Sequence, residues 1–537
     1  MSDNYWVSRA KGSDDATHII REALEKSLCE SRLHEFNEEL KQIVSDDGYG
    51  QILESTPLEL IPILLLASDS IETSPHPLKN TYELIARYGS PKEILLVVQE
   101  SLDVLLREAK ELENEEESAS STPAQIVWKL LRLIEMSTLA FPRLVPRKRS
   151  APETAIPIVQ HIQNSLGILG TLIDPNEPVS LEVVEACIGL GYSLLGWFDV
   201  VGSKADEVAE CKMALENLLR VAVAECLSDN QVMQGYNNFL DRVRIAGLDF
   251  TSIHFPEPSS KMTGSTRTQL LGGFILYYLS NQGLIRPKGT RQALRGQLAG
   301  LSEALRRPRW RQTALGAIND CILGGLYEEK SWKKISRPKS YLAQMISTPA
   351  STDPDSKSRA TLFNLLTQII LKVQPSHAFK FIRDLASEEC PYLNMRSSAI
   401  SLLRRLVVRA FNHDPPARDD PFASQLLLEE YNPILLQSPV LEEKEAEGLK
   451  FVDTQEMNRL VEVLGFFYVL FARDGKNLTG VRSAESIKVL RNKLVVPLTK
   501  ITCEQEPVLE DPSLYFAMRS ISVSLERIEE IISRIES

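Results

Sequence analysis

Residues 376–411 read SHAFKFIRDLASEECPYLNMRSSAISLLRRLVVRAF. In the first part, Phe379 and Ile382 stand three positions apart, a spacing that places apolar side chains on one helical face. The same spacing returns over residues 399–410, with arginines between the apolar positions. The segment 389–394 between them contains a proline, which cannot continue the first helix. The stretch predicts two antiparallel helices joined by a short turn, the unit of a HEAT-like repeat.

Helix starts of a related kind recur outside this stretch. Ser90-Pro91-Lys92-Glu93 and Thr122-Pro123-Ala124-Gln125 both have the pattern of a capping box with proline at the first helical position. No Asn-Gly or Asp-Gly turn joins alternating runs of the kind that form hairpins. The sequence therefore predicts an all-α protein, an irregular HEAT/ARM-like α-solenoid of stacked antiparallel helix pairs.

Polar segments divide the predicted helices into regions. Acidic, serine-rich and proline-rich stretches without apolar periodicity mark the expected linkers and loops. The expected regions are an N-terminal helical region (1–112), an acidic and serine-rich linker (113–124), middle helical repeats (125–255), a loop (256–264), a basic helical segment (265–346), a Pro/Ser loop (347–358) and C-terminal HEAT-like repeats (359–537).

Composition limits the classes of partner. The chain has 537 residues, 43% hydrophobic and 25% charged, which is typical of a folded protein. Its 72 acids against 60 bases give a net charge of −12. Because phosphate-neutralising cations are outnumbered, we expect no nucleic-acid partner and no anionic membrane surface. The longest uncharged stretches contain many polar residues, so we expect buried helices there and no bilayer span.

Cysteine use and the first residues indicate the compartment. The seven cysteines are odd in number and far apart, which fits a reducing environment without a disulfide framework. The N-terminal stretch has early acids and no apolar core of a secretory signal. We expect a cytoplasmic protein. The cluster of Arg143 and 147–149 is typical of a basic surface loop, with a nuclear-localisation signal as the alternative.

Enzyme signatures are missing from the sequence. It contains no GxxxxGK[ST], GxGxxG, HExxH, GxSxG or CxxC, and its seven histidines are scattered singly. We therefore expect no catalytic residue, no cofactor and no metal site. The glycine-rich run Gly189–Gly196 has the wrong spacing for a dinucleotide loop, and we interpret it as a site of tight helix packing.

Positive charge is concentrated between residues 286 and 339, where thirteen bases and four acids give a local charge of +9. A basic surface on an acidic chain suits an acidic protein partner, and a tryptophan among the bases could grip that partner by stacking. The alternative is a solvated face beside a turn between repeats. The candidate partner-binding patch consists of Arg306, Arg307, Arg309, Trp310, Arg311, Lys333 and Lys334.

The C-terminal stretch has a heptad pattern with alternating spacings of four and three. One interpretation is a seam for a partner helix such as a leucine zipper. The other is a terminal helix that closes the open end of a solenoid, which we favour. The candidate seam consists of Leu514, Met518, Ile521, Leu525, Ile528, Ile532 and Ile535.

The turn inside the opening stretch carries a family resemblance. Cys390-Pro391-Tyr392-Leu393-Asn394-Met395-Arg396-Ser397-Ser398-Ala399-Ile400 resembles the CPY–N–R–AI stretch of the glomulin and fungal Yap-binding protein family. The matching positions are turn and packing positions, so Cys390, Pro391, Asn394 and Arg396 are candidate structural residues. Because the neighbouring Glu388 and Glu389 disfavour a thiolate, we interpret Cys390 as structural and not as a redox sensor.

The resemblance also implies a function. Proteins of this family are irregular α-solenoids that act by binding other proteins. Fungal members bind a bZIP stress transcription factor and promote its peroxide-dependent activation, whereas animal members cap the RING subunit of cullin–RING ubiquitin ligases. The resemblance therefore implies a non-enzymatic adaptor for a bZIP factor in the oxidative stress response, with cullin–RING regulation as the alternative and a cryptic enzyme as the third possibility.

Overall fold

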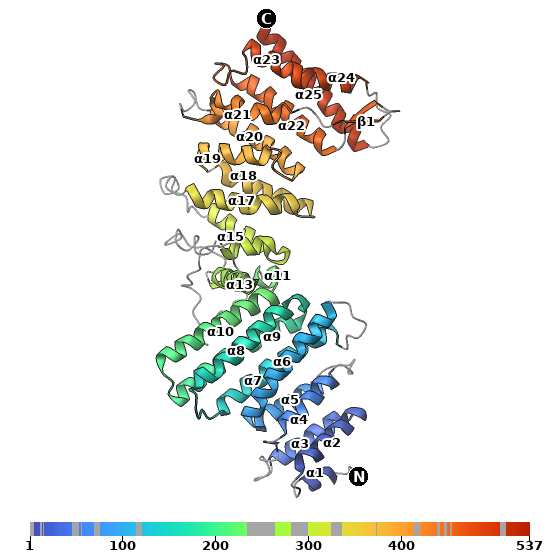
Figure 1. Cartoon of the computed structure of the whole chain (residues 1–537), viewed down its shortest axis with the longest axis vertical. Helices are drawn as coiled ribbons and strands as arrows, with labels where there is room; N and C mark the ends of the chain where they lie inside the picture. The colour runs from blue at the N-terminus through green and yellow to red at the C-terminus, as the bar shows by residue number, and fades with distance from the viewer. Residues whose placement is uncertain are drawn as a thin grey trace. The chain divides into compact units, whose positions relative to one another are not determined.

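The computed structural model describes residues 5–10, 13, 15–45, 53–54, 56–68, 76–113, 121–233, 264–280, 299–323, 336–371, 373–412, 419–437, 441–444, 448–451, 454–504 and 512–537. The chain divides into two compact units, Met1–Cys321 and Ile322–Ser537. Both are built from helices (Figure 1). The predicted all-α solenoid of stacked helix pairs is confirmed.

The first unit is a two-layered stack of helices. In one layer α3, α5, α7 and α9 pack side by side, and in the other α2, α4, α6, α8 and α10 do so (Figure 1). Helix α13 then packs against α10. The bounds are α1 (Tyr5–Ala10), α2 (Ala16–Cys29), α3 (Leu33–Ser45), α4 (Pro57–Ala67), α5 (His76–Tyr88), α6 (Pro91–Glu113), α7 (Pro123–Ala140), η2 (Phe141–Arg143), α8 (Ala151–Leu169), η3 (Gly170–Leu172), α9 (Pro178–Val201), α10 (Ala205–Cys226), α11 (Asp229–Met233), α13 (Gly264–Ser280), η4 (Pro308–Trp310) and α15 (Arg311–Leu323), whose last two residues are assigned to the second unit.

The two predicted capping boxes have different outcomes. At Thr122 the box is complete, since its hydroxyl accepts from the Gln125 amide and the Gln125 side chain accepts from the Thr122 amide. At Ser90 the helix begins at Pro91 as predicted, but the Ser90 amide donates to the Glu54 carbonyl oxygen at 3.3 Å. The Ser90 amide is thus satisfied by the preceding repeat and not by the helix it precedes.

The second unit is also a stack, in which α17, α20, α22 and α25 pack in succession. The predicted helix pair of residues 376–411 is present as α19 and α20. The bounds are α17 (Ser336–Thr352), α18 (Ser356–Leu371), α19 (Pro375–Ala386), α20 (Leu393–Phe411), η5 (Pro421–Ala423), α21 (Leu426–Leu435), β1 (Leu441–Lys444), β2 (Gly448–Phe451), α22 (Thr454–Arg473), α23 (Ala484–Leu490), the π-helical turn η6 (Arg491–Val495), α24 (Val496–Glu504) and α25 (Pro512–Glu536). The short antiparallel pair β1–β2 is the one sheet among the described residues.

Two predicted boundaries are wrong in detail. Residues 347–352 of the expected Pro/Ser loop form the last turns of α17, and only 353–355 separate this helix from α18. The Asp355 carboxylate accepts from the Ser358 amide at 2.9 Å, so the polar residues here start a helix instead of forming a long loop. The expected linker is shorter than predicted as well, because α7 begins at Pro123. Residues 114–120 and 256–263 of the expected linker and loop lie outside the described residues.

The heptad seam lies inside the second unit. Met518, Ile521, Leu525, Ile528 and Ile532 are buried and α25 packs against α22 and α24, while Ile535 is half-buried. The side chain of Leu514 lies outside the described ones. The interpretation that this helix closes a solenoid therefore agrees with the structure, since its apolar face is covered by its own unit.

Helix α9 is the longest apolar helix among the described residues of the first unit. Its length and mean hydropathy of 1.4 would allow a membrane span, a test that core helices of globular proteins also pass. It packs against α7, α8 and α10, and its hydrogen bonds from Ser193 Oγ to Thr138 O (2.7 Å) and Trp197 Nε1 to Leu144 O (3.2 Å) fix it to the preceding repeat. The predicted tight packing at Gly189 and Gly196 is wrong, because a Cβ at either position would meet nothing within 4 Å.

Candidate protein-binding surfaces

Two arginines of the predicted basic patch, Arg307 and Arg309, meet the buried carboxylate of Glu225 at the end of α10. Arg307 Nη1 lies 2.7 Å from Glu225 Oε1, and Arg309 Nη2 lies 3.2 Å from Oε2. Arg309 also donates to the Glu225 backbone oxygen at 2.8 Å. Thr268 of α13 completes the cluster, since its hydroxyl donates to Glu225 Oε1 at 3.2 Å and accepts from Arg307 at 2.9 Å. These charges join α10, α13 and the residues before α15 to one another.

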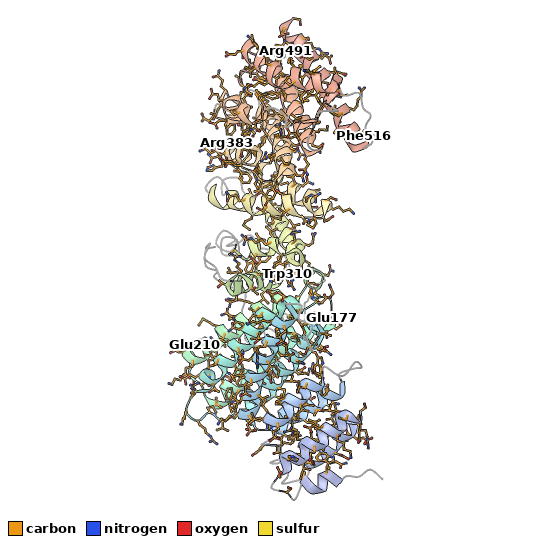
Figure 2. The ribbon with its side chains drawn as sticks, turned by 45° about the vertical axis from the view of Figure 1, so that its right-hand side comes forward. Glu177, Glu210, Trp310, Arg383, Arg491 and Phe516 are labelled. Atoms are coloured by element: carbon orange, nitrogen blue, oxygen red, sulfur yellow. The ribbon has the colours of Figure 1, made fainter. Side chains whose placement is uncertain are left out.

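Trp310 is part of the same internal contact. Figure 2 marks its position. Its side chain is fully buried, and its indole N–H donates to the Ala224 carbonyl oxygen at 3.0 Å. A buried indole cannot stack on a partner, so this part of the prediction is wrong. Burying an indole with its N–H satisfied stabilises the junction between neighbouring repeats.

The remaining members of the patch do not restore a basic surface. Arg306 is 62% exposed but lies 3.6 Å from Glu303, and Arg311 donates to the Leu305 carbonyl oxygen at 3.3 Å. Lys333 and Lys334 lie outside the described residues. The structure thus corrects the centre of the predicted patch, Arg307, Arg309 and Trp310, to an internal clamp in which these side chains serve folding and not a partner.

Asp229 adds a second acid to this junction. Its carboxylate accepts from the amides of Gln312 (2.9 Å) and Thr313 (3.0 Å), the first turn of α15. Burial raises the pKa of Asp229, and the hydrogen bonds from Thr313 and Gln312 act in the opposite direction. Sequence reasoning missed both Glu225 and Asp229. The available signal for Glu225 was an acid inside the apolar run LLRVAVAEC, where a charge needs a counter-ion.

The turn at Cys390 has the structural role that the sequence predicted. Arg396 Nε donates to the Cys390 carbonyl oxygen at 2.8 Å, and its Nη2 donates to that of Glu388 at 2.7 Å. Cys390 is buried, with 7% exposure, and its sulfur lies 3.8 Å from the Tyr392 carbonyl oxygen. The predicted cap is displaced, since α20 begins at Leu393 with Tyr392 before it and Asn394 lies inside the helix.

The other described thiols divide by burial. Burial raises the pKa of Cys187 and of Cys211 to about 12 and that of Cys226 well above its usual value. Cys29 and Cys503 are exposed. Among the described residues no three His, Cys, Asp or Glu side chains come together as a metal site would require.

One residue of the basic cluster considered as a localisation signal, Arg143, forms internal hydrogen bonds. Arg143 donates to the carbonyl oxygens of Ala86 at 2.9 Å and Gly89 at 2.7 Å, which ties η2 to the end of α5. Residues 147–149 are exposed.

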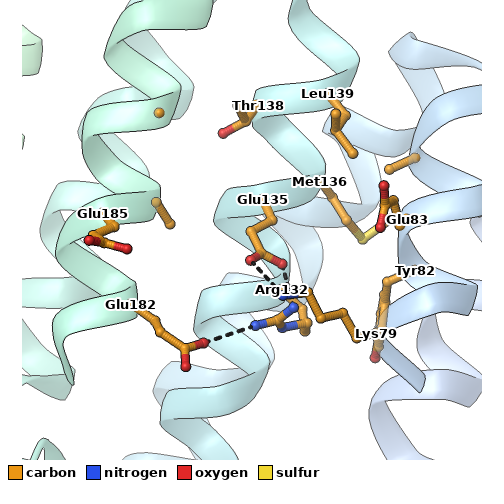
Figure 3. A pocket seen from close by; sticks show the side chains of 13 residues that line it. Lys79, Tyr82, Glu83, Arg132, Glu135, Met136, Thr138, Leu139, Glu182 and Glu185 are labelled. Carbon is orange, nitrogen blue, oxygen red and sulfur yellow. Dashed lines mark ion pairs between the residues drawn. The ribbon is translucent and has the colours of Figure 1, made fainter. Parts of the chain in front are cut away.

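A surface hollow of about 560 Å³ lies where α5, α7 and α9 meet in the first unit (Figure 3). We call it the α5/α7/α9 groove. Each of these three helices contributes charged side chains to it, and acids outnumber bases. The charged lining residues are Lys79 and Glu83 from α5, Arg132 and Glu135 from α7, and Glu182 and Glu185 from α9.

Arg132 is the central charge of the groove. Its side chain is 2% exposed, and its guanidinium lies 2.5 Å from Glu135 and 3.7 Å from Glu182 (Figure 3). Its carbon Cζ lies 5.3 Å from the ring centroid of Trp128, within cation–π range. Burial lowers the pKa of Arg132 and raises that of Glu135. The attraction between the two charges acts in the opposite direction on both pKa values and so favours their ionised forms.

Comparison with known proteins finds one family model that matches part of the chain. The model described as "Uncharacterised protein family, YAP/Alf4/glomulin" matches residues 339–513. The predicted family resemblance is confirmed. No curated protein matches the sequence. A crystal structure of a Kap121p mutant aligns with 99% of the chain at 14% identity and a TM-score of 0.21, and the chain spans 51% of the length of that protein.

The YAP/Alf4/glomulin segment lies in the second unit and runs from the first turn of α17 to the first two residues of α25. It contains the Cys390 turn and the helix pair on which the resemblance depends. The match of this segment to the YAP/Alf4/glomulin family, together with the helical-repeat fold, indicates a protein-binding adaptor. The α5/α7/α9 groove and the Glu225 clamp lie outside the matched residues.

Proposed function

We propose that the chain is a non-enzymatic adaptor that binds a bZIP stress transcription factor and promotes its activation during oxidative stress. The observation that carries the proposal is the YAP/Alf4/glomulin match over residues 339–513, in the unit that contains the predicted turn and helix pair. A stack of helix pairs offers a long side-chain surface, which suits recognition of another protein more than a reaction in a closed pocket.

The adaptor would act by position. Holding a transcription factor beside its oxidant raises their effective concentration and needs no reacting group on the scaffold. The buried thiols Cys187, Cys211 and Cys390 support this mechanism, because a sensor thiol has to be exposed and easily ionised. Under this proposal the oxidised thiols belong to the partner.

Affinity purification of the tagged full chain, with and without peroxide, tests the proposal. We expect a bZIP factor to be recovered and mass spectrometry to identify it. Direct binding of that factor, purified, to the purified chain should follow. Recovery of a cullin with its RING subunit in place of a bZIP factor would support the alternative adaptor function and refute this one.

A double cysteine variant tests whether the scaffold itself supplies a reacting thiol. A chain in which the two exposed cysteines, Cys29 and Cys503, are both replaced by serine should promote oxidation of the factor as well as the wild type does. If the double variant binds the factor but no longer promotes its oxidation, the scaffold supplies a thiol and the positional mechanism is wrong.

A further inference from the structure

The α5/α7/α9 groove carries an excess of negative charge that its own cations do not balance. Arg132 is shared between Glu135 and Glu182, and Lys79 approaches the same Glu135 at 4.0 Å. Glu83 is paired with Arg87, one turn along α5 and not among the groove's lining residues. Six charged side chains therefore leave the hollow acidic, and a cationic side chain entering it gains attraction from several carboxylates at once.

Exposure separates the groove's acids from its central cation. The Arg132 side chain is 2% exposed and is already shared between Glu135 and Glu182, so a partner does not reach it directly. The Glu182 and Glu83 side chains are 53% and 43% exposed. A partner entering the groove therefore meets carboxylates first, which favours a cationic side chain.

The face of α9 that lines the groove continues beyond it as an exposed apolar face. Glu182, Glu185 and Gly189 line the hollow, and the same helical face then presents Tyr192 (61% exposed), Gly196 and Val200 (85% exposed). A Cβ on either glycine would meet nothing within 4 Å, so a partner backbone could approach α9 closely there. The surface is thus acidic at one end and apolar at the other.

We infer that this surface is a docking site for a basic amphipathic helix of a protein partner. Lysine or arginine side chains of that helix enter the α5/α7/α9 groove beside Glu182 and Glu185, and its apolar side chains cover Tyr192 and Val200. Charge complementarity selects the basic end, and the apolar face fixes the direction in which the helix lies. The inference rests on the proposed protein-binding function but requires no bZIP factor.

Binding of a synthetic probe to the full chain tests the inference. The probe is a fluorescein-labelled 18-residue peptide with lysine and arginine on one helical face and leucine on the other. The comparison peptide has glutamate in place of every basic residue. We expect fluorescence anisotropy to show saturable binding of the basic peptide, weaker at 400 mM than at 100 mM salt, and none of the acidic one.

Two variants locate the binding. Gly189→Leu fills the groove without changing charge, and because leucine favours helix over glycine, the melting temperature should be kept or raised. Glu182→Lys reverses one groove charge. Each should weaken the basic peptide about tenfold or more. The matched control is Glu210→Lys, the same charge change at an exposed position on α10 (Figure 2). It should leave the affinity within about twofold.

Three results would overturn the inference. They are unchanged affinity in both groove variants, equal weakening in Glu210→Lys, and concentration-dependent self-association that Gly189→Leu abolishes, which would make a second copy the occupant. Because the assay contains no transcription factor, its failure would leave the proposed bZIP partnership standing. Conversely, failure to recover a bZIP factor would leave the groove measurement unaffected.

Discussion

Removing the Glu225 carboxylate should destabilise the first unit more than any comparable surface change. Glu225→Ala removes the carboxylate that pairs with both Arg307 and Arg309, at 2.7 and 3.2 Å, and leaves Arg307 with the longer ion pair to Glu303 at 3.5 Å. Truncating one member of a buried pair typically costs about 3–5 kcal/mol. Because both arginines are about a quarter exposed, water recovers part of this loss, and we expect about 2–3 kcal/mol.

Urea unfolding followed by tryptophan fluorescence measures this loss. Four of the five tryptophans belong to the first unit, and Trp310 itself packs beside Glu225, so the signal reports mainly on the affected unit. The matched control is Glu210→Ala on the same helix, where the side chain is exposed and we expect a change below about 0.5 kcal/mol. Glu225→Gln should fall between the two, because its amide oxygen still accepts from one arginine.

A Glu225→Ala midpoint that coincides with that of Glu210→Ala, at equal slope, would refute the reasoning. It would mean that the arginines find water or other acceptors without loss, and that the clamp is a consequence of the packing and not a cause of it.

Four further outcomes are expected. Glu108→Ala should lower the free energy of unfolding by about 2–4 kcal/mol, because buried Lys129 loses the carboxylate 3.1 Å away. Lys129→Met should lower it by less than half as much. Native thiol labelling read by mass spectrometry should modify Cys29 and Cys503 within minutes and the buried Cys187 only on unfolding, because a pKa of about 12 leaves little thiolate. Cys390→Ser should keep the melting temperature within a few degrees and retain partner binding; loss of peroxide signalling by a folded variant would contradict the structural role. Burial raises the pKa of Asp229 in the folded chain above its ordinary value of 3.8. Protonated Asp229 therefore contributes stability that is fully present below pH 3.8 and is lost as the pH rises through the folded pKa. Asp229→Asn should flatten that part of a stability–pH curve, and an unchanged slope would contradict the assignment.

The helix pairs could be predicted from sequence because their signals are local. Apolar spacing, a proline in a turn and a capping residue act within one or two turns of helix, as at Thr122 and in the 376–411 pair. A serine start is less certain, since at Ser90 the backbone bonds to the preceding repeat. Fold class follows from many such signals taken together.

The basic patch could not be judged from sequence, because its counter-ion is distant. Glu225 precedes Arg307 by 82 residues, and only the stacking of α10 beside the later segment brings the charges together. Counting charge along the chain assumes that each arginine is solvated. The α5/α7/α9 groove could not be predicted for the same reason. Its three helices are separated in sequence by α6 and α8, and each acid alone resembles an ordinary exposed helix position.

Ion pairs with a buried member recur at the junctions between helices of the first unit. Lys129 with Glu108 joins α7 to α6, Arg132 with Glu182 joins α7 to α9, and Glu225 joins α10 to the segment before α15. An irregular solenoid without a strict sequence period has apolar faces that could pair in several registers. A buried charge is stable only in the packing register that supplies its counter-ion, whereas a leucine can pack in several registers. Such pairs cost stability compared with apolar residues, but they fix which helices become neighbours, and the α5/α7/α9 groove exists only when α5, α7 and α9 are held in that order.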